Sequence, residues 1–210
     1  MTVDWYFDFI SPYAYLQCVR FPELPAGTQL RVKPVLFGAL LDNVGTLGPA
    51  EIPGKREFTY RQSLWLADKH GVKLKIPPRH PFNPLAVLRL AASLDAPLET
   101  VQHIYEFIWA EGRDPSDPRE FSALAAELGI ADAEARIADP QVKAKLKTNT
   151  DEAIAAGVWG VPSFVADGIC FWGFDSGAML LDYLANPAIF SGPEYARIDT
   201  LPSGIQRKRN

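Results

Sequence analysis

The sequence predicts an α/β fold in which a two-part sheet is interrupted by a block of helices. Residues 3–36 carry the pattern of a strand, a helix and a second strand, whereas the middle of the chain shows helical periodicity. Two short strands and one more helix follow near the C-terminus. We therefore expect one discontinuous α/β domain, residues 1–54 and 150–210, around an all-helical insertion of residues 55–149.

The first strand and helix are predicted by a change of periodicity at Ser11. Residues 3–9 alternate bulky apolar with polar side chains, which is typical of a strand. Ser11 and Pro12 then favour a helix start, because serine is a good N-cap and proline fits the first helical position. A second strand over residues 30–36 completes a βαβ unit, and Pro34 favours an edge position because it cannot donate to a ladder.

The middle of the chain is predicted to be a loop followed by helices. Residues 37–54 are rich in glycine and proline, which predicts a long loop, and loops of this length are often functional. Apolar residues at helical spacing, with cap and breaker residues at the ends, then predict a run of helices. The predicted helices cover residues 57–70, 85–94, 101–109, 121–128 and 140–156.

The C-terminal part is predicted to return to strands. Residues 163–166 and 169–172 are short and mostly apolar, and the Asp-Gly pair between them is typical of a type I′ hairpin. The Asp-Ser pair at residues 175–176 then begins a last helix, which is expected to run through Leu184.

The composition argues against several classes of function. The chain of 210 residues has a net charge of −4, and its basic cluster at residues 207–209 is expected to be a solvated tail, so no nucleic-acid partner is expected. The apolar runs are too short to cross a membrane, and the first residues do not resemble a secretory signal. We therefore expect a cytoplasmic protein without a membrane partner.

The cysteines and histidines do not predict a redox or metal centre. Cys18 and Cys170 form no Cys-x-x-Cys pair, and their apolar neighbours favour buried, unreactive thiols. The histidines His70, His80 and His103 are isolated in the sequence. A metal site needs several converging ligands, so no metal is expected.

The strand-to-helix turn at Ser11 is the first candidate for chemistry. A helix N-terminus presents free N–H groups and the positive end of the helix dipole, so it stabilises an anion such as a thiolate. Ser11 supplies a hydroxyl there, which can donate a hydrogen bond to a sulfur that another molecule brings. The alternative is that Ser11 only caps its own helix.

Two further candidates lie beside the C-terminal strands. A cis bond before Pro162 would turn Val161 outward, so that its backbone could pair with an extended peptide-like ligand. The alternative is an ordinary proline at the start of a strand. Asp175 could bind an ammonium group, and Ser176 with the amides of its helix could bind a carboxylate, unless Asp175 is only an N-cap.

Together, and in this order, these motifs resemble one family, the 2-hydroxychromene-2-carboxylate isomerases, which are kin to kappa-class glutathione transferases and DsbA-like disulfide oxidoreductases. The resemblance covers nearly the whole chain up to Leu184. It is carried by Asp8–Leu16, Pro49–Arg56, Pro81–Asn83, Gly160–Ser163 and Phe171–Gly173 with Asp175. It implies a thioredoxin-like domain interrupted by a helical domain, with glutathione at the place of the redox site.

The resemblance also implies roles for single residues. It implies that Ser11 contacts the glutathione sulfur, and that Val161, before a cis Pro162, pairs its backbone with the cysteinyl part of glutathione. Asp175 matches a position that holds the γ-glutamyl end. Lys55 matches a lysine that reaches the glycine carboxylate.

Several positions depart from the family's pattern. Thr46 stands where the loop often has asparagine, Ser176 where arginine is common, and Phe174 where a polar residue is frequent. Ser176 is still expected on the glutathione side of the site. Asn83 and Tyr13 are expected on the substrate side.

The activity that the resemblance implies is isomerisation by reversible covalent catalysis. A glutathione thiolate adds to a conjugated aromatic substrate, a bond rotates or a ring opens, and the thiol leaves, so that glutathione is a cofactor. Trp5, Tyr13, Trp65 and Trp109 are candidates for lining an apolar pocket, and the core is the alternative place for most of them.

Three other functions stay open. A kappa-type glutathione transferase would share the site and release a conjugate. A DsbA-like oxidoreductase would need a cysteine where Ser11 stands, and a glutathione-binding protein without turnover would keep only the fold. A homodimer is the expected assembly on general grounds.

Overall fold

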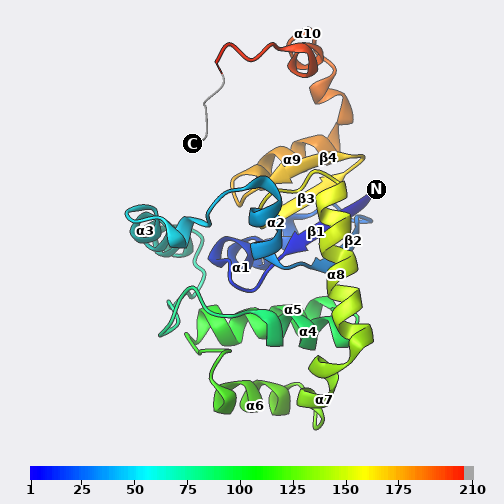
Figure 1. Ribbon diagram of the computed structural model, residues 1–210. Coiled ribbons are helices and arrows are strands. Elements are labelled where there is room, and N and C mark those ends of the chain that lie inside the picture. Colours follow the sequence, from blue (N-terminus) through cyan, green and yellow to red (C-terminus); the bar gives the residue numbers. More distant parts are fainter. Residues whose placement is uncertain (206–210) are drawn as a thin grey trace.

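The computed structural model describes residues 1–205 and has a mixed four-stranded sheet at its centre, in the order β2-β1-β3-β4 (Figure 1). β1 pairs in parallel with β2, whereas β3 is antiparallel to β1 and to β4. The strands are β1 Thr2–Phe7, β2 Gln29–Pro34, β3 Ser163–Ala166 and β4 Ile169–Trp172. The basic cluster at residues 207–209 lies outside the described residues.

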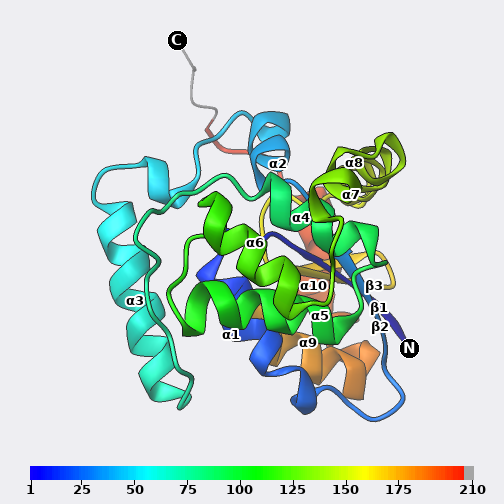
Figure 2. The same ribbon diagram turned by 90° about the horizontal axis from the view of Figure 1, so that it is seen from below.

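Helices cover both faces of this sheet. α2 and α8 pack on one face, and α1, α4, α5 and α9 on the other, as Figure 2 shows from below. α3 stands at one side of the molecule in both views. The helices are α1 Pro12–Val19, α2 Phe37–Val44, α3 Lys55–Lys69, α4 Leu85–Ser93, α5 Leu98–Tyr105, α6 Pro118–Glu127, α7 Ala133–Ala138, α8 Pro140–Ala155, α9 Ser176–Ala185 and α10 Pro193–Arg197.

The central strand β1 is buried on both faces, although its sequence alternates. Trp5 and Phe7 stack on one face, with ring centroids 4.3 Å apart, and join the aromatic cluster around Tyr105. Tyr6 points to the other face and packs in the second cluster with Leu40 of α2. Because β1 has a partner strand on each side and helices on each face, its polar positions are also covered.

Most predicted elements are confirmed. Pro34 lies at the end of the edge strand β2, as expected from its missing donor. The hairpin between β3 and β4 turns at Asp167 and Gly168, with φ of 48° and 80°, which is the pattern of a type I′ turn. The helices predicted at residues 57–70 and 140–156 are present as α3 and α8.

The loop predicted over residues 37–54 is wrong in its first half, which forms α2. Phe37, Leu40 and Leu41 lie on one side of this helix, and Leu40 is fully buried. Gly45 ends the helix in the left-handed conformation, with φ 64°. The glycines therefore mark the end of a short helix, and a single 3₁₀ turn, Pro49–Glu51, follows.

Three other elements differ from the sequence prediction. The helix expected over residues 101–109 is α5 followed by a π-helical turn, Glu106–Ala110. α7 fills a stretch for which no helix was predicted, and α10 follows the helix that was expected to be the last. Short helices of this kind carry too few apolar positions to show a period.

The sheet and the helical block share one core. Its main cluster contains Trp5 and Phe7 of the sheet together with Tyr105 and Trp109 of the block. α8 runs along the sheet and crosses the predicted boundary at residue 149, so the division into residues 1–54 with 150–210 and residues 55–149 stays a prediction. In the part of the chain that the structure describes, no helix combines the length and apolar character that a membrane crossing requires.

Candidate functional site

A cavity of about 300 Å³ lies where α1 and α2 begin, at the end of β1. This volume is at the lower limit of typical small-molecule sites. Its walls come from the turn before α1, from α2, from the 3₁₀ turn and from the segment around His80. The lining residues are Asp8, Ile10, Ser11, Pro12, Tyr13, Leu36, Phe37, Gly38, Leu41, Gly48, Pro49, Ala50, Glu51, Thr59, His80, Pro81, Pro84 and Val161.

Ser11 is both the cap of α1 and a wall of the cavity. Its Oγ accepts a hydrogen bond from the Ala14 N–H at 3.3 Å, and its own N–H donates to the Asp8 carbonyl at 3.1 Å. A hydroxyl has one donor and two lone pairs, so the cap uses a single lone pair. The hydroxyl hydrogen is free to donate to a ligand, and the two alternatives for Ser11 are therefore compatible.

Three side chains of the helical block hold the turn before Ser11. Each donates to a successive backbone carbonyl of residues 8–10, and these contacts orient the peptide groups that lead into α1. The pairs are Tyr105 Oη to Asp8 O at 3.2 Å, Trp109 Nε1 to Phe9 O at 2.8 Å and His80 Nε2 to Ile10 O at 2.8 Å. Trp109 lies in the π-helical turn, a feature that is frequent at functional sites.

His80 was expected to be an isolated histidine, and the structure places it in this network. Its Nε2–H faces the Ile10 carbonyl, so Nδ1, at 2.9 Å from the Tyr60 hydroxyl, is the acceptor. Burial lowers the pKa of His80, the Ile10 contact opposes that change, and Arg56 lowers the pKa further. The ring is therefore neutral at neutral pH and serves as a donor to the turn.

Asp8 is fully buried and lies at the same cavity. Its Oδ1 accepts from the Ile10 N–H at 3.1 Å and its Oδ2 from the Phe37 N–H at 2.9 Å. Burial raises the pKa of this carboxyl to about 7, against the opposing effect of the two N–H groups. In the sequence, Asp8 is a polar position of the first strand and the first residue of the motif Asp8–Leu16, but neither pattern predicts a role for its carboxyl group.

Tyr13 lines the cavity, and its place on the substrate side stays a prediction. Its hydroxyl donates to Gln62 Oε1 of α3 at 2.7 Å. Burial raises the pKa of Tyr13, and the charge of Asp175 adds to this effect. Tyr13 therefore connects the cavity wall to α3 through its hydrogen bond to Gln62.

The Val161–Pro162 bond is cis, as the sequence suggested. Val161 lines the cavity opposite the start of α2, and within residues 1–205 its backbone N–H and C=O have no hydrogen-bond partner. The Pro162 carbonyl accepts from the Gly173 N–H at 2.8 Å, which joins this corner to the segment before α9.

Asp175 and Ser176 lie beyond the residues that line the cavity. Asp175 occupies the N-cap position of α9, but its side chain makes no capping hydrogen bond and is exposed, so the simple N-cap explanation is wrong. The Ser176 hydroxyl donates to the Gly173 carbonyl at 2.9 Å. Its partner is thus a protein carbonyl in this structure.

The remaining candidates are also outside the cavity lining. Lys55 is the first residue of α3 and is exposed. Asn83 is exposed, and its Oδ1 accepts from the Leu85 N–H at the start of α4, at 3.0 Å, although Pro81 and Pro84 on either side do line the cavity. Thr46 lies at a separate, open hollow beside α2.

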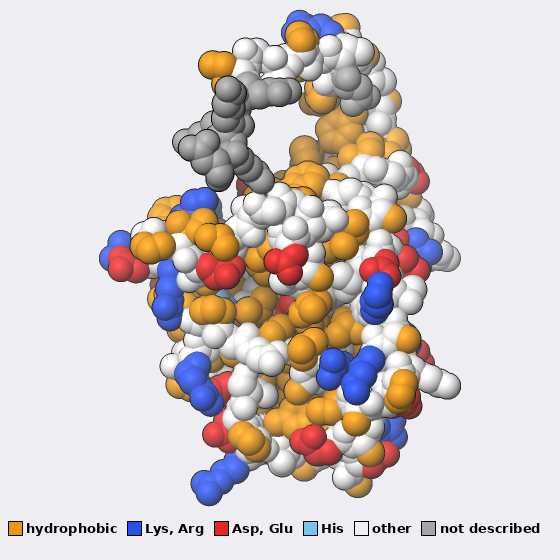
Figure 3. All heavy atoms as spheres, in the orientation of Figure 1, with side chains coloured by type: hydrophobic (Ala, Val, Ile, Leu, Met, Phe, Trp, Pro, Cys, Tyr) orange, Lys and Arg blue, Asp and Glu red, His pale blue; other side chains and the backbone are white. Residues whose placement is uncertain are grey.

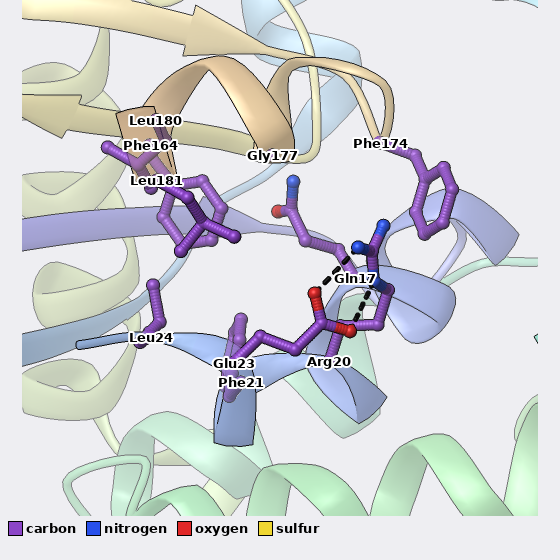
Figure 4. Close-up of a pocket in the computed structure, with 10 residues that line it drawn as sticks. All are labelled: Gln17, Arg20, Phe21, Glu23, Leu24, Phe164, Phe174, Gly177, Leu180 and Leu181. Carbon is purple, nitrogen blue, oxygen red and sulfur yellow. Dashed lines mark hydrogen bonds and ion pairs between the residues drawn. The ribbon is translucent and has the colours of Figure 1, made fainter. Parts of the chain in front are cut away.

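Behind the site, a pocket of about 30 Å³ lies between the end of α1 and α9 (Figure 4). Gln17 reaches from α1 toward this junction. Its Oε1 accepts from Trp5 Nε1 at 2.7 Å, and its Nε2 donates to the Gly173 carbonyl at 3.2 Å. By volume, the pocket has room for about one water molecule. The structural feature that matters there is the hydrogen bond from Gln17, which connects α1 to the segment just before Asp175.

The two cysteines do not line the cavity at Ser11. Both are free, Cys18 is buried, and burial raises the pKa of both thiols. Among residues 1–205, His, Cys, Asp and Glu side chains form no group that could hold a metal ion.

Comparisons with known proteins identify the family and the fold of the chain. The family described as DSBA-like thioredoxin domain matches residues 2–185. A 2-hydroxychromene-2-carboxylate isomerase of Sphingobium xenophagum is 29% identical over 197 residues, covering 87% of this chain and 97% of that protein. Glutathione S-transferase kappa 1 of Rattus norvegicus is 27% identical over 205 residues, covering 87% and 90%.

Solved structures support the same fold. A structure of 2-hydroxychromene-2-carboxylate isomerase superposes with a TM-score of 0.76 at 21% identity, covering 95% of this chain and 98% of the other. The thioredoxin-like fold with added helices, predicted from the motifs, is therefore confirmed. The chain belongs to the family of DSBA-like thioredoxin domains.

Proposed function

We propose that the protein is a glutathione-dependent isomerase of aromatic substrates of the 2-hydroxychromene-2-carboxylate type. The observation that carries this proposal is Ser11, whose hydroxyl lies at a helix N-terminus and at a largely apolar cavity. Such a position favours a thiolate brought by a ligand, because the helix amides and the hydroxyl both donate to an anion. The curated relatives named as isomerases favour the same reaction class.

Glutathione would lie across the cavity as an extended tripeptide. In this proposal its sulfur faces Ser11, and its cysteinyl backbone pairs with the free amide and carbonyl of Val161 before Pro162. The exposed carboxylate of Asp175 holds the γ-glutamyl ammonium group. Lys55, which has no ion-pair partner within the described residues, reaches the glycine carboxylate.

Ser176 and Asn83 have secondary places in the proposal. Ser176 stands at the start of α9, where helix amides and its hydroxyl can add donors for a carboxylate once the bond to Gly173 is exchanged. In this proposal Asn83, which lies in the chain between the cavity-lining residues Pro81 and Pro84, and Tyr13 of α1 contact the aromatic substrate. Ile10, Leu36, Phe37 and Leu41 provide the apolar wall for the ring.

The reaction follows from this placement. The sulfur lone pair forms a C–S bond with a conjugated carbon of the substrate, and the displaced π electrons move to its carbonyl oxygen. After a bond rotates or a ring opens, the electrons return, the C–S bond breaks and the thiolate is regenerated. Glutathione is not consumed.

The test combines turnover with a thiol count. We expect the purified protein to interconvert the chromene and open-chain forms only with glutathione present, and the concentration of free thiol to stay constant. Ser11→Ala is expected to lower kcat/KM about 100-fold, since one donor to a developing anion is lost. Ser122→Ala, on the exposed face of α6, is the matched control. Absence of glutathione binding would overturn the proposal.

A kappa-type glutathione transferase is the second candidate, because the rat relative carries that name. It would consume one free thiol for each substrate molecule, and the same thiol count separates the two activities. A DsbA-like oxidoreductase is disfavoured because neither cysteine lies at the cavity. A binding protein would show glutathione affinity without turnover of either kind.

The cellular setting and assembly complete the proposal. We place the protein in the cytoplasm, where glutathione keeps thiols reduced, in keeping with two free cysteines.

We propose a homodimer without nucleic-acid or membrane partners. Phe58 and Trp65 of α3 are 61% and 57% exposed, and apolar side chains gather over this helix in Figure 3. Elution at twice the mass of 23.2 kDa is expected in size-exclusion chromatography.

A further inference from the structure

The buried carboxylate of Asp8 connects the two walls of the cavity. One oxygen accepts from the Ile10 N–H, in the turn before Ser11, and the other from the Phe37 N–H, at the start of α2. α2 has no side-chain cap of its own at Leu36, so Asp8 takes that place from another element. Each carboxylate oxygen still has lone pairs for a proton.

The charges around Asp8 leave it without a positive partner among the described residues. Two uncharged N–H groups are its hydrogen-bond donors. The ionisable side chains that share its surroundings are Tyr105 of α5, His80 of the cis-proline segment, Tyr13 of α1 and Glu51 of the 3₁₀ turn. His80 is neutral, as its donor contact to Ile10 and its lowered pKa indicate.

We propose that Asp8 is the proton acceptor of the site: its carboxylate takes up a proton when the glutathione thiol ionises beside Ser11, and returns it when the thiol re-forms. This inference rests on the proposed function. The S–H bond breaks, the sulfur keeps the electron pair, and the proton ends on a carboxylate oxygen of Asp8. The net charge of the site stays the same.

Electrostatics gives the direction of this exchange. A carboxyl with a pKa of about 7 is partly ionised in the empty site at neutral pH. A thiolate in the same cavity is a second negative charge, and like charges that share a site favour protonation of the weaker acid. Ser11 cannot take this proton, and both ring nitrogens of His80 are already engaged, so Asp8 is the group that responds.

The proposal predicts the number of protons released when glutathione binds. Isothermal titration at pH 7 in two buffers of different ionisation enthalpy measures this number. Binding as a thiolate alone would release about one proton, because a free thiol has a pKa near 8.5. Uptake by Asp8 should reduce the release to about half a proton in the wild type, and Asp8→Asn should restore it to about one.

A buried aspartate outside the cavity provides the control. Asp114 is also buried but is paired with Arg79, at 2.6 Å, so Asp114→Asn should keep the wild-type proton release. Equal release by the wild type and Asp8→Asn, with glutathione bound to both as thiolate, would overturn the role of Asp8. Loss of thiolate binding in the wild type would instead overturn the proposed function.

A measurement on the wild type alone keeps the inference testable if Asp8→Asn does not fold. Proton release should fall with a midpoint near pH 7 as Asp8 becomes available to take up a proton. Without Asp8, the release should stay near one proton up to about pH 7.5 and fall only as the free thiol itself ionises. A midpoint near pH 8.5 would contradict the proposal.

Discussion

Gly173 connects three segments of the site through a single backbone position. Its N–H donates to the Pro162 carbonyl, and its own carbonyl accepts from Gln17 of α1 and from Ser176 of α9. Its φ of 90° lies in a region that side chains rarely adopt. A Cβ atom at this position would also lie 2.6 Å from Oδ1 of Asp175, so a larger residue there would push this exposed carboxylate aside.

Gly173→Ala should therefore weaken glutathione binding as well as the fold. Gly168 in the hairpin has a similar φ of 80°, but a Cβ there would meet nothing within 4 Å. Both substitutions should cost about 1–2 kcal/mol of unfolding free energy from the backbone conformation. Only Gly173→Ala should displace the carboxylate of Asp175 and raise the Kd for glutathione several-fold. Equal affinity of the two variants in a titration would contradict this role.

At the scale of elements, the helical block does more than cover the sheet. Tyr105 of α5, Trp109 of the π-helical turn and His80 beside a cis proline each donate to one carbonyl of the turn before Ser11. A buried carbonyl without a partner is costly, so these donors fix one arrangement of that turn. The geometry of a turn in the N-terminal strand-helix unit thus depends on residues about 70 to 100 positions later in the chain.

Trp109→Phe tests this dependence, since it keeps an aromatic ring in the core and removes the Nε1–H that reaches the Phe9 carbonyl. We expect a loss of about 1–3 kcal/mol in unfolding free energy, measured by urea denaturation, because one buried acceptor loses its donor. We also expect a lower kcat with glutathione saturating, since Ser11 is less precisely held. Tyr195→Phe, in an exposed position of α10, is the control. An unchanged kcat in Trp109→Phe would show that the turn is fixed without this bond.

Elements with a clear periodicity of apolar residues could be predicted from the sequence, whereas contacts between residues distant in the chain could not. The strands, the hairpin and the long helices were recoverable because each carries its own pattern. α2 was missed because Gly38 and Gly45 suggested a loop, whereas its start is stabilised from other elements, by Asp8 and by Thr150 of α8. Ser11, Tyr13 and Val161, named from two separate motifs, line one cavity, and their roles there stay predictions. Asp8 and His80 could not be assigned, because their roles depend on burial and on partners far away in the chain.

At the scale of the whole molecule, the cavity lies where the sheet, α2 and the helical block meet, and folding buries some of the groups that line it, among them Asp8 and Ser11. The main core cluster contains residues of both the sheet and the block. The turn at Ser11 is therefore expected to unfold together with the rest of the chain. A polar group retained there is a cost to folding unless it is paired. Asp8 is such a group, and its ionisation should therefore be visible in the stability of the entire chain.

The pH dependence of unfolding is the prediction that follows. Asp8 has an ordinary pKa of 3.8 and a folded-state pKa of about 7, so the folded protein binds the proton more tightly than the unfolded chain. Its contribution to stability is therefore greatest below about pH 4 and is lost progressively as the pH rises to about 7 and beyond. Between pH 5.5 and 8.0 the loss from Asp8 should be about 2 kcal/mol.

Asp8→Asn isolates this contribution from those of other groups. His80 acts in the opposite direction, because its lowered pKa makes the folded state resist protonation in acid, and that effect is common to both proteins. The unfolding free energy of the wild type should fall between pH 5.5 and 8.0 more steeply than that of the variant, by about 2 kcal/mol in urea titrations at the two pH values. Asp114→Asn, which keeps Asp8, should fall as steeply as the wild type. Parallel pH profiles for the wild type and Asp8→Asn would mean that the Asp8 carboxyl is already ionised in the folded protein well below neutral pH.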